Sequence, residues 1–332
     1  MSTLLDVQHL KKYFPVTEGI LHAVDDVTFT MEKGETLGVV GESGCGKSTL
    51  GKTILRLTNP TDGKIIFDGQ DITACSDAEF NKLRPQMQMI FQDPLSSLNP
   101  RMSIKQQIEE PLLIYKIYPD KEEREKRVLE LMDTVGLARR YADMYPHELD
   151  GGRRQRIGIA RGLALNPKLI ICDEPVSALD VLIQAQILNL LQDLQREKGL
   201  TYMFITHDLS VVKHISNHIC VMYLGQIVEK SESKELFSHT LHPYTKALLS
   251  AIPVPSLEKK RQRIALKGEL VSPIDPKEGC RFAPRCLYAT EECFKRNPEL
   301  KEVGDKHWVA CHRVEELNDL STLKPVTKQE AE

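Results

Sequence analysis

The segment Gly41–Ser48, which reads GESGCGKS, constrains the fold more than any other stretch of this chain. It follows the short apolar run ETLGVV at residues 35–40, and the helical pattern KSTLGKTILRL begins where it ends. Glycines let consecutive backbone amides curl around an anion, and a helix start adds its positive end. The spacing G-x-x-x-x-G-K-S between a strand and a helix therefore predicts a phosphate-binding loop rather than an ordinary glycine turn.

If the loop binds a nucleotide, two of its polar residues have expected roles. Lys47 is expected to reach the β and γ phosphates, and the Ser48 hydroxyl to ligate Mg²⁺. The predicted ATP-binding residues of the loop are Gly41, Ser43, Gly44, Cys45, Gly46, Lys47, Ser48 and Thr49.

Acidic residues follow a second apolar run, LIICDEP at residues 169–175. Asp173 is expected to hold Mg²⁺ through water, and Glu174 to polarise the water that attacks the nucleotide. Taken alone, the pair is better explained as a solvated acidic turn. Beside a phosphate-binding loop, it predicts a hydrolytic site.

Strands alternate with long helices along the chain. The run YMFITHD at residues 202–208 repeats the pattern of residues 169–175, and the helical period between them stops at Gly199. This alternation predicts an α/β fold with a mostly parallel sheet that is covered on both faces and binds ligands at the carboxyl ends of its strands. Residues 63–73, together with the early run LLDVQHLKKYF, predict a small antiparallel β-subdomain. The charged helical text at residues 103–146 predicts an inserted helical subdomain.

Composition sets outer limits on function. The chain has 332 residues, of which 41% are hydrophobic and 27% charged, enough for a full core and a smaller second unit. A net charge of −3 provides no overall basic field, so nucleic acid is not an expected partner. The amino-terminal stretch lacks the apolar core of a secretory signal, and no segment reaches the roughly 20 apolar residues that span a bilayer. If the protein acts at a membrane, other chains must cross it.

The eight cysteines are unevenly spread. Those that lie apart and are expected to fill the core are Cys45, Cys75, Cys172 and Cys220. Those that crowd into a short C-terminal segment are Cys280, Cys286, Cys293 and Cys311. In a cytosolic chain such a cluster favours a metal site over disulfides. The spacing C-x5-C-x6-C-x17-C lacks the CxxC pairs of common zinc ribbons.

The order of the motifs resembles that of the nucleotide-binding subunits of ABC transporters. The segments that carry the resemblance are GESGCGKST, MIFQDP, LDGGRRQRIGIARGLALNPKLIICDEPVSALD and FITHD, and it covers about residues 1–250. The resemblance implies a P-loop NTPase that hydrolyses ATP held between two subunits.

The same resemblance implies roles for further residues. Gln92 matches the glutamine that senses Mg²⁺ and the water, Asp180 the D-loop aspartate, and His207 the switch histidine that contacts the γ-phosphate. Tyr13 sits where the family stacks an aromatic ring on adenine, with Phe14 as the competing choice. Read singly, three of them have a plainer explanation. Gln92 could be a turn residue, His207 a hydrogen-bonded histidine at the end of a strand, and Tyr13 a core aromatic.

The signature segment departs from the family pattern LSGGQ. Its residues are Leu149, Asp150, Gly151, Gly152 and Arg153. Aspartate caps a helix as well as serine does, but an ionised carboxylate cannot donate to phosphate and repels it. Unit charges about 4 Å apart interact by about 4 kcal/mol at an effective dielectric near 20, unless Arg153 points inward and offsets the charge. The departure predicts a weakened composite ATP site and thus asymmetric sites in a heterodimer.

The C-terminal stretches HPYTKALLSAIPVP, GCRFAPRCLYATEECF and VACH resemble the extension of the dipeptide and oligopeptide importer ATPases. In close relatives the resemblance implies a [4Fe-4S] cluster held by the four crowded cysteines. Zinc and unligated cysteines stay open as alternatives. His307 and His312 lie near enough in sequence to replace a ligand, although exposed histidines are the expected interpretation.

The predicted organisation is an ATPase domain at 1–252, with its helical subdomain at about 95–165, a linker at 253–279, a cysteine-rich module at 280–314 and a disordered tail at 315–332. The implied partners are a second ATPase subunit, two membrane permease subunits and an extracellular or periplasmic solute-binding protein. The chain is then peripheral, on the cytoplasmic face of the cell membrane. Import of nickel or metal chelates, and a soluble ABC ATPase acting on ribosomes or DNA, are the alternative functions.

Overall fold

The computed structural model describes residues 2–93, 97–252, 263–268 and 271–323. The chain forms two compact units, each made of segments that are distant in sequence. Unit 1 comprises Met1–Leu4, Glu32–Glu35 and Ala74–Ile205, and unit 2 comprises Leu5–Met31, Thr36–Thr73 and Thr206–Glu332. This division does not test the boundaries predicted at residues 252, 279 and 314, which stay predictions.

Unit 1 contains three strands that pair in parallel. They are β6 (Met87–Ile90), β7 (Leu169–Asp173) and β8 (Thr201–Thr206). Every residue of β7 and β8 is buried, as expected for strands with both faces covered. The strands predicted at 169–175 and 202–208 are therefore confirmed.

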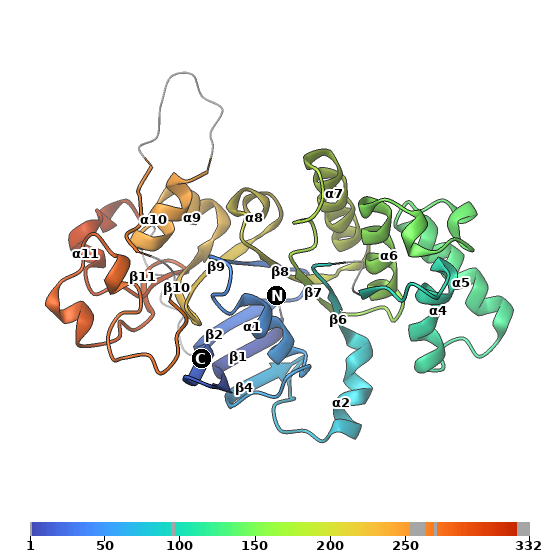
Figure 1. Ribbon diagram of the computed structural model, residues 1–332, viewed down its shortest axis with the longest axis horizontal. Coiled ribbons are helices and arrows are strands. Elements are labelled where there is room, and N and C mark those ends of the chain that lie inside the picture. The colour runs from blue at the N-terminus through green and yellow to red at the C-terminus, as the bar shows by residue number, and fades with distance from the viewer. Residues whose placement is uncertain (1, 94–96, 253–262, 269–270, 324–332) are drawn as a thin grey trace. The chain divides into compact units, whose positions relative to one another are not determined.

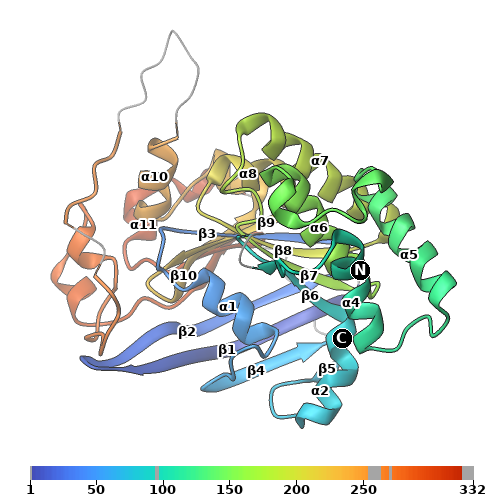
Figure 2. The same cartoon turned by 45° about the vertical axis from the view of Figure 1, so that its right-hand side comes forward.

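The helices of unit 1 begin at polar caps. They are α2 (Asp77–Leu83), α4 (Ile104–Ile114), α5 (Lys121–Thr134), α6 (Gly151–Leu163) and α7 (Val181–Lys198), with 3-10 turns η1 (Arg84–Gln86), η2 (Arg139–Tyr141) and η3 (Pro146–Glu148). Helix α6 packs against α4, α5 and α7 (Figure 2). Helix α7 ends at Gly199, which adopts the left-handed conformation with φ 64°, so the predicted stop is confirmed.

Unit 2 contains a four-stranded antiparallel sheet (Figure 1). Its strands, in the order β2-β1-β4-β5, are β1 (Thr3–Val16), β2 (Gly19–Glu32), β4 (Asp62–Phe67) and β5 (Gln70–Asp71). Strands β1 and β4 pair with Leu5 opposite Phe67 and Val7 opposite Ile65, and all four of these side chains are buried. One face of this sheet therefore covers core.

A second set of strands in unit 2 positions the phosphate-binding loop. They are β3 (Thr36–Val40), β9 (His218–Tyr223), β10 (Gln226–Glu232), β11 (Lys301–Gly304) and β12 (His307–Val309). Strands β3 and β9 are parallel, whereas β9, β10, β12 and β11 follow one another antiparallel. The remaining elements are helices α1 (Lys47–Ile54), α8 (Leu209–Ile215), α9 (Ser233–Ser238), α10 (Pro243–Ser250) and α11 (Val314–Leu317), with turns η4 (Ala283–Arg285), η5 (Glu291–Phe294) and η6 (Leu320–Thr322).

The C-terminal region is more regular than the sequence indicates. Strand β12 extends the sheet from β10, with Glu229 opposite Val309. Within the predicted linker, Ile274 forms a β-bridge with Leu21. In the described part of the predicted tail, the side chains of Leu320 and Leu323 pack against a buried apolar cluster. Residues 324–332 lie outside the described residues.

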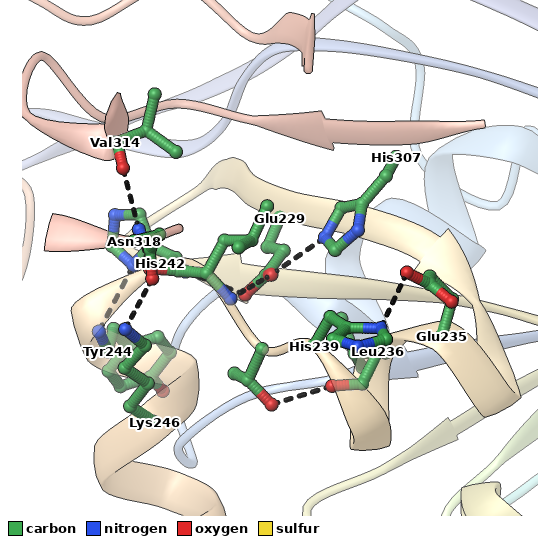
Figure 3. A network of polar contacts seen from close by, with 12 residues as sticks. Glu229, Glu235, Leu236, His239, His242, Tyr244, Lys246, His307, Val314 and Asn318 are labelled. Carbon is green, nitrogen blue, oxygen red and sulfur yellow. Dashed lines mark hydrogen bonds and ion pairs between the residues drawn. The ribbon is translucent and has the colours of Figure 1, made fainter. Parts of the chain in front are cut away.

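A buried carboxylate ties the C-terminal region together (Figure 3). Glu229 of β10, with no exposed surface, accepts the main-chain N–H of Leu241 at 2.8 Å and of His242 at 3.1 Å. His307 of β12 lies with Nε2 2.9 Å from the same carboxylate and is only 1% exposed. Burial lowers the pKa of His242 to about 4, so its neutral ring accepts the N–H of Tyr244. The expectation that His307 is exposed is therefore wrong, because β12 places it against β10.

The isolated cysteines divide in two ways. Cys45, Cys172 and Cys220 are buried, as expected for core residues, whereas Cys75 is partly exposed. Within the residues that the structure describes, we find no helix that is both long and apolar enough to cross a lipid bilayer.

We expect His307→Ala to lower the free energy of unfolding by about 3 kcal/mol, because it opens a cavity and removes one of three donors from a buried carboxylate. The single tryptophan, Trp308, lies in β12 itself, so its fluorescence during urea denaturation reports this region. Lys295→Ala is the control: its ion pair with Glu291 is exposed, and a change of at most about 0.5 kcal/mol is expected. Equal midpoints for the two variants contradict the prediction.

Candidate functional site

The phosphate-binding loop of unit 2 has a backbone that only glycine can adopt. It connects β3, whose five residues are all buried, to α1. Gly46 has φ 103°, and a Cβ at this position would lie 2.0 Å from the carbonyl oxygen of Ala23. A Cβ on Gly41 would lie 2.2 Å from the carbonyl oxygen of Met222. Both contacts are with main chain, which cannot move aside as a flexible side chain can.

The Lys47 side chain bridges two carbonyl groups of the phosphate-binding loop. Its ammonium donates to the carbonyl oxygens of Gly41 at 2.8 Å and Glu42 at 2.9 Å, and the residue is 4% exposed. Helix α1 starts after Gly46 with no side-chain cap on its first amides. A buried cation beside uncapped helix amides is an arrangement suited to phosphate. The other predicted residues lie in the loop (Ser43, Gly44 and Cys45) or in the first turn of α1 (Ser48 and Thr49).

Tyr13 of β1 is held in a fixed orientation. Its ring stacks on His22 with centroids 3.9 Å apart and an interplanar angle of 24°. Its hydroxyl donates to Asp25, and burial together with this carboxylate raises the pKa of Tyr13. The competing ring, Phe14, is covered by the ammonium of Lys12 at 4.6 Å. Tyr13 is therefore the more rigid of the two candidate platforms.

The acidic pair of unit 1 sits at the end of β7. Asp173 is 4% exposed, and Glu174 adopts the left-handed conformation with φ 46°. Its N–H donates to the carbonyl of Ile205 at 2.9 Å, which fixes that backbone. The side-chain amide of Gln92 donates to the Glu174 carboxylate at 3.0 Å. The structure thus brings together two of the three residues predicted to be catalytic.

The signature segment of unit 1 forms the start of α6. Asp150 accepts the N–H of Arg153 at 2.8 Å, as an N-cap does, and its second oxygen pairs with the Arg153 guanidinium at 2.5 Å. A Cβ on Gly152 would lie 2.7 Å from the side chain of Ile183. Leu149 is buried. The carboxylate that the sequence leaves as an open acceptor is therefore paired with the arginine three residues on.

The remaining predicted residues lie at element starts. Asp180 caps α7 by accepting the N–H of Ile183 at 3.0 Å. His207 is exposed and lies between β8 and Asp208, the cap of α8. The residues divide between the units: the loop, Tyr13 and His207 belong to unit 2, and Gln92, the acidic pair, the signature and Asp180 to unit 1.

The four crowded cysteines of unit 2 line one small cavity of about 20 Å³. N–H groups approach three of the sulfurs: Tyr288 donates to Cys286 at 3.4 Å, the N–H groups of Phe282 and Ala283 approach Cys280, and that of Arg313 approaches Cys311. Burial raises the pKa of Cys280 to about 11. Among the described residues, however, no three His, Cys, Asp or Glu side chains are close enough together to hold a metal ion. The four thiols are donors that soft metals prefer, and they line the same cavity. The positions of their sulfurs in this structure do not form a metal site.

The ABC transporter family pattern matches residues 24–177, and the pattern described as the C-terminal region of oligopeptide and dipeptide transporters matches residues 228–293. The oligopeptide transport ATP-binding protein AppF of Bacillus subtilis is 53% identical over 94% of this chain and 97% of its own length. This chain belongs to the ABC transporter ATPases, in the oligopeptide and dipeptide group. It is an ATPase subunit of that family.

Other relatives of this ABC ATPase support the same assignment. The dipeptide transport ATP-binding protein DppF of Haemophilus influenzae is 50% identical over 95% of this chain and 98% of its own length. Among solved structures, the dimeric, post-hydrolysis state of the ATP-binding cassette MJ0796 bound to ADP and Pi is 32% identical with a TM-score of 0.64. It covers 69% of this chain and 99% of that one, so the fold of the ATPase part is shared.

Sequence reasoning missed four residues of the ABC ATPase that form two ion pairs next to its predicted site residues. Arg285 binds Glu42 in the phosphate-binding loop, and Arg281 binds Asp25, the partner of Tyr13. The only available signal was the spelling CRFAPRC, in which each arginine adjoins a cysteine of the cluster. That spelling contains no information about the partners, which are more than 240 residues away.

Proposed function

We propose that this ATPase powers the import of dipeptides or oligopeptides through separate membrane permeases. The observation that carries the proposal is the 53% identity with AppF over 97% of that protein, which includes the C-terminal region typical of this group. In this proposal the chain lies at the cytoplasmic face of the membrane and works with a second ATPase subunit, two permeases and a solute-binding protein. ATP binding closes the two ATPase subunits, and hydrolysis reopens them.

The residues act on a nucleotide in defined ways. The amides of the loop and the Lys47 ammonium bind the β and γ phosphates, and Tyr13 supports the adenine ring. Ser48 and Asp173 would hold Mg²⁺ through the hard oxygen ligands that it prefers, and the bound ion would supply positive charge beside the phosphates. Glu174 takes a proton from the attacking water, and Gln92, 3.0 Å away, keeps its carboxylate oriented. His207 contacts the γ-phosphate.

We expect Lys47→Ala to lower magnesium-dependent ATP hydrolysis of the assembled transporter at least about 100-fold, by loss of phosphate binding. Glu174→Gln is expected to keep ATP binding but to slow turnover about 100-fold or more, because an amide cannot accept the proton. Lys52→Ala, an exposed lysine of the same helix, is the control and leaves turnover unchanged. Full turnover in Lys47→Ala contradicts the proposed nucleotide site.

The solute is tested with the same assembly. Addition of the solute-binding protein loaded with dipeptides or oligopeptides is expected to raise ATPase turnover. Stimulation by nickel or metal chelates alone points instead to the alternative importer function. A chain that stays wholly soluble when co-expressed with its permeases favours an ABC ATPase that acts away from membranes.

The signature segment is proposed to make the two ATP sites unequal. Because Arg153 neutralises Asp150, the site that uses LDGGR is expected to be weakened less than an unpaired carboxylate would weaken it. The partner subunit then supplies the signature for this chain's own phosphate-binding loop. Such an arrangement requires a heterodimer.

We expect Arg153→Gln alone to lower ATPase turnover of the assembled complex several-fold, since it exposes phosphate to an unpaired carboxylate. The double variant Asp150→Ser with Arg153→Gln restores the pattern LSGGQ and is expected to exceed the wild type. Turnover and ATP affinity are measured for four proteins: the wild type, Arg153→Gln, Asp150→Ser and the double variant. If Asp150→Ser leaves both unchanged, the weakened site is discarded.

The four cysteines are proposed to hold a [4Fe-4S] cluster that acts as a structural clip, with zinc as the alternative. All four line one cavity, thiolates suit either metal centre, and N–H groups approaching sulfur are typical neighbours of such ligands. When bound, the cluster would cross-link the turns that carry the cysteines. Its formation would require the sulfurs to move closer together than they lie in this structure.

Protein purified without oxygen is expected to contain about four iron and four sulfide per chain. Cys293→Ser should lose most of this iron, because it removes a buried ligand from the cavity. Cys75→Ser, outside the module, should retain it. Zinc without iron and sulfide overturns the cluster proposal, and absence of both metals supports unligated cysteines.

A further inference from the structure

An arginine from the cysteine-bearing segment reaches the phosphate-binding loop. Arg285 binds Glu42 with two parallel hydrogen bonds, Nη1 to Oε2 at 2.6 Å and Nη2 to Oε1 at 3.0 Å. The Arg285 side chain is 10% exposed, and this two-bond geometry fixes both groups. The N–H of Glu42 donates to the hydroxyl of Tyr244 at 2.9 Å. The second residue of the loop is therefore held by its main chain and by its side chain.

The charge of Glu42 gives this contact a further consequence. A carboxylate within a loop that binds phosphate repels the ligand unless a cation neutralises it. Lys47 contacts the carbonyl oxygen of Glu42, not its carboxylate. Arg285 is the cation that faces the carboxylate, and this contact raises the pKa of Arg285, so the guanidinium stays charged.

A second arginine of the same segment reaches the aromatic platform. The Arg281 guanidinium pairs with Asp25, and the same carboxylate accepts the hydroxyl of Tyr13. Burial alone would raise the pKa of Asp25, but the hydrogen bond from Tyr13, the charge of Arg281 and the contact with His22 lower it. The Asp25 carboxylate is thus ionised, and it fixes the Tyr13 ring through the phenolic hydroxyl.

The turn between β9 and β10 joins the two contacts. Arg281 donates to the carbonyl of Leu224, and the N–H of Gly225 donates to the carbonyl of Cys45 in the loop at 2.8 Å. The carbonyl of Gly225 accepts the N–H of Asp25 at 2.9 Å. A Cβ on Gly225 would lie 2.6 Å from the carbonyl oxygen of His22, so only glycine fits here.

The segment that carries both arginines is itself anchored. Phe282 lies between them in sequence and is 2% exposed. Its ring packs at 5.2 Å from Tyr223 and 5.5 Å from Tyr244, measured between centroids. Because Tyr244 also binds the loop, movement of Phe282 would shift both the arginines and the loop.

We propose that Arg281 and Arg285 are positioning residues of the nucleotide site, in which one short segment sets both ends of the bound nucleotide. Arg285 acts on the phosphates through Glu42, and Arg281 acts on the base through Asp25 and Tyr13. This inference rests on the proposed roles of the loop and of Tyr13. It assigns the C-terminal segment a role in ATP binding that its cysteines alone do not.

The two arms of the proposal predict different ligand profiles, which calorimetry on the full chain can measure with Mg-ATP and with Mg-tripolyphosphate, which has no base. Arg285→Met is expected to lower the affinity for both ligands about tenfold. Arg281→Met is expected to weaken Mg-ATP about tenfold and to leave Mg-tripolyphosphate unchanged. Arg296→Met, which removes an exposed pair with Glu292 in the same module, is the control and changes neither.

Double-variant cycles distinguish positioning from general loosening of the fold. If Arg285 acts through Glu42, then Glu42→Gln adds no further loss to Arg285→Met and restores part of the affinity, because it removes the unpaired carboxylate, and Asp25→Asn adds little to Arg281→Met. Arg285→Lys, which keeps the charge but not both bonds, is expected to recover part of the affinity. It also keeps the test valid if Arg285→Met fails to fold.

Three outcomes overturn the proposal: effects equal to those of Arg296→Met, fully additive cycles, or loss of tripolyphosphate binding in Arg281→Met that matches the loss of ATP. Failure of the proposed function is distinct. In that case the wild-type chain binds neither ligand in a way that depends on Lys47. If binding depends on Lys47 but on neither arginine, the positioning role is wrong and the proposed nucleotide site stands.

Discussion

The structure depends on a helix whose first amides have no side-chain cap. Helix α1 begins directly after Gly46, in a backbone conformation that a side chain would prevent by contact with Ala23. Uncapped amides attract anions, so this point has to lie beside a cation and away from unpaired carboxylates. Lys47 supplies the cation within the loop. The contacts around this anion site neutralise the carboxylates that lie near it.

Two carboxylates near the predicted phosphate contacts are each paired with an arginine. Asp150 at the start of α6 pairs with Arg153, and Glu42 in the loop pairs with Arg285. The first pair lies within one helical turn, is about half exposed and is the weaker for it. The second is largely buried and two-bonded, so it restricts the loop as well as neutralising it. The same chemistry thus serves a local cap in one unit and a long-range brace in the other.

The C-terminal region belongs to the architecture of unit 2 and is more than an appendage. Strand β12 extends its sheet, the buried Glu229 links β10 to His307, and Phe282 enters an aromatic cluster. A buried carboxylate that loses its partners is costly, so β10, β12 and the start of α10 are expected to unfold together. This rigidity explains how a segment that carries cysteines can also hold Arg281 and Arg285 in place.

The phosphate-binding loop, the buried strands and the helix ends at Asp150 and Gly199 were predictable from the sequence. Each is a local property, in which spacing over a few residues decides backbone conformation or capping. The Asp150–Arg153 pair could be foreseen only as an option, because side-chain direction is not encoded in spacing. The pairs of Arg281 with Asp25 and Arg285 with Glu42, and the burial of His307, were decided by tertiary structure alone. Their partners are brought together by sheet pairing and aromatic packing between segments up to 256 residues apart, and no periodic pattern records such contacts.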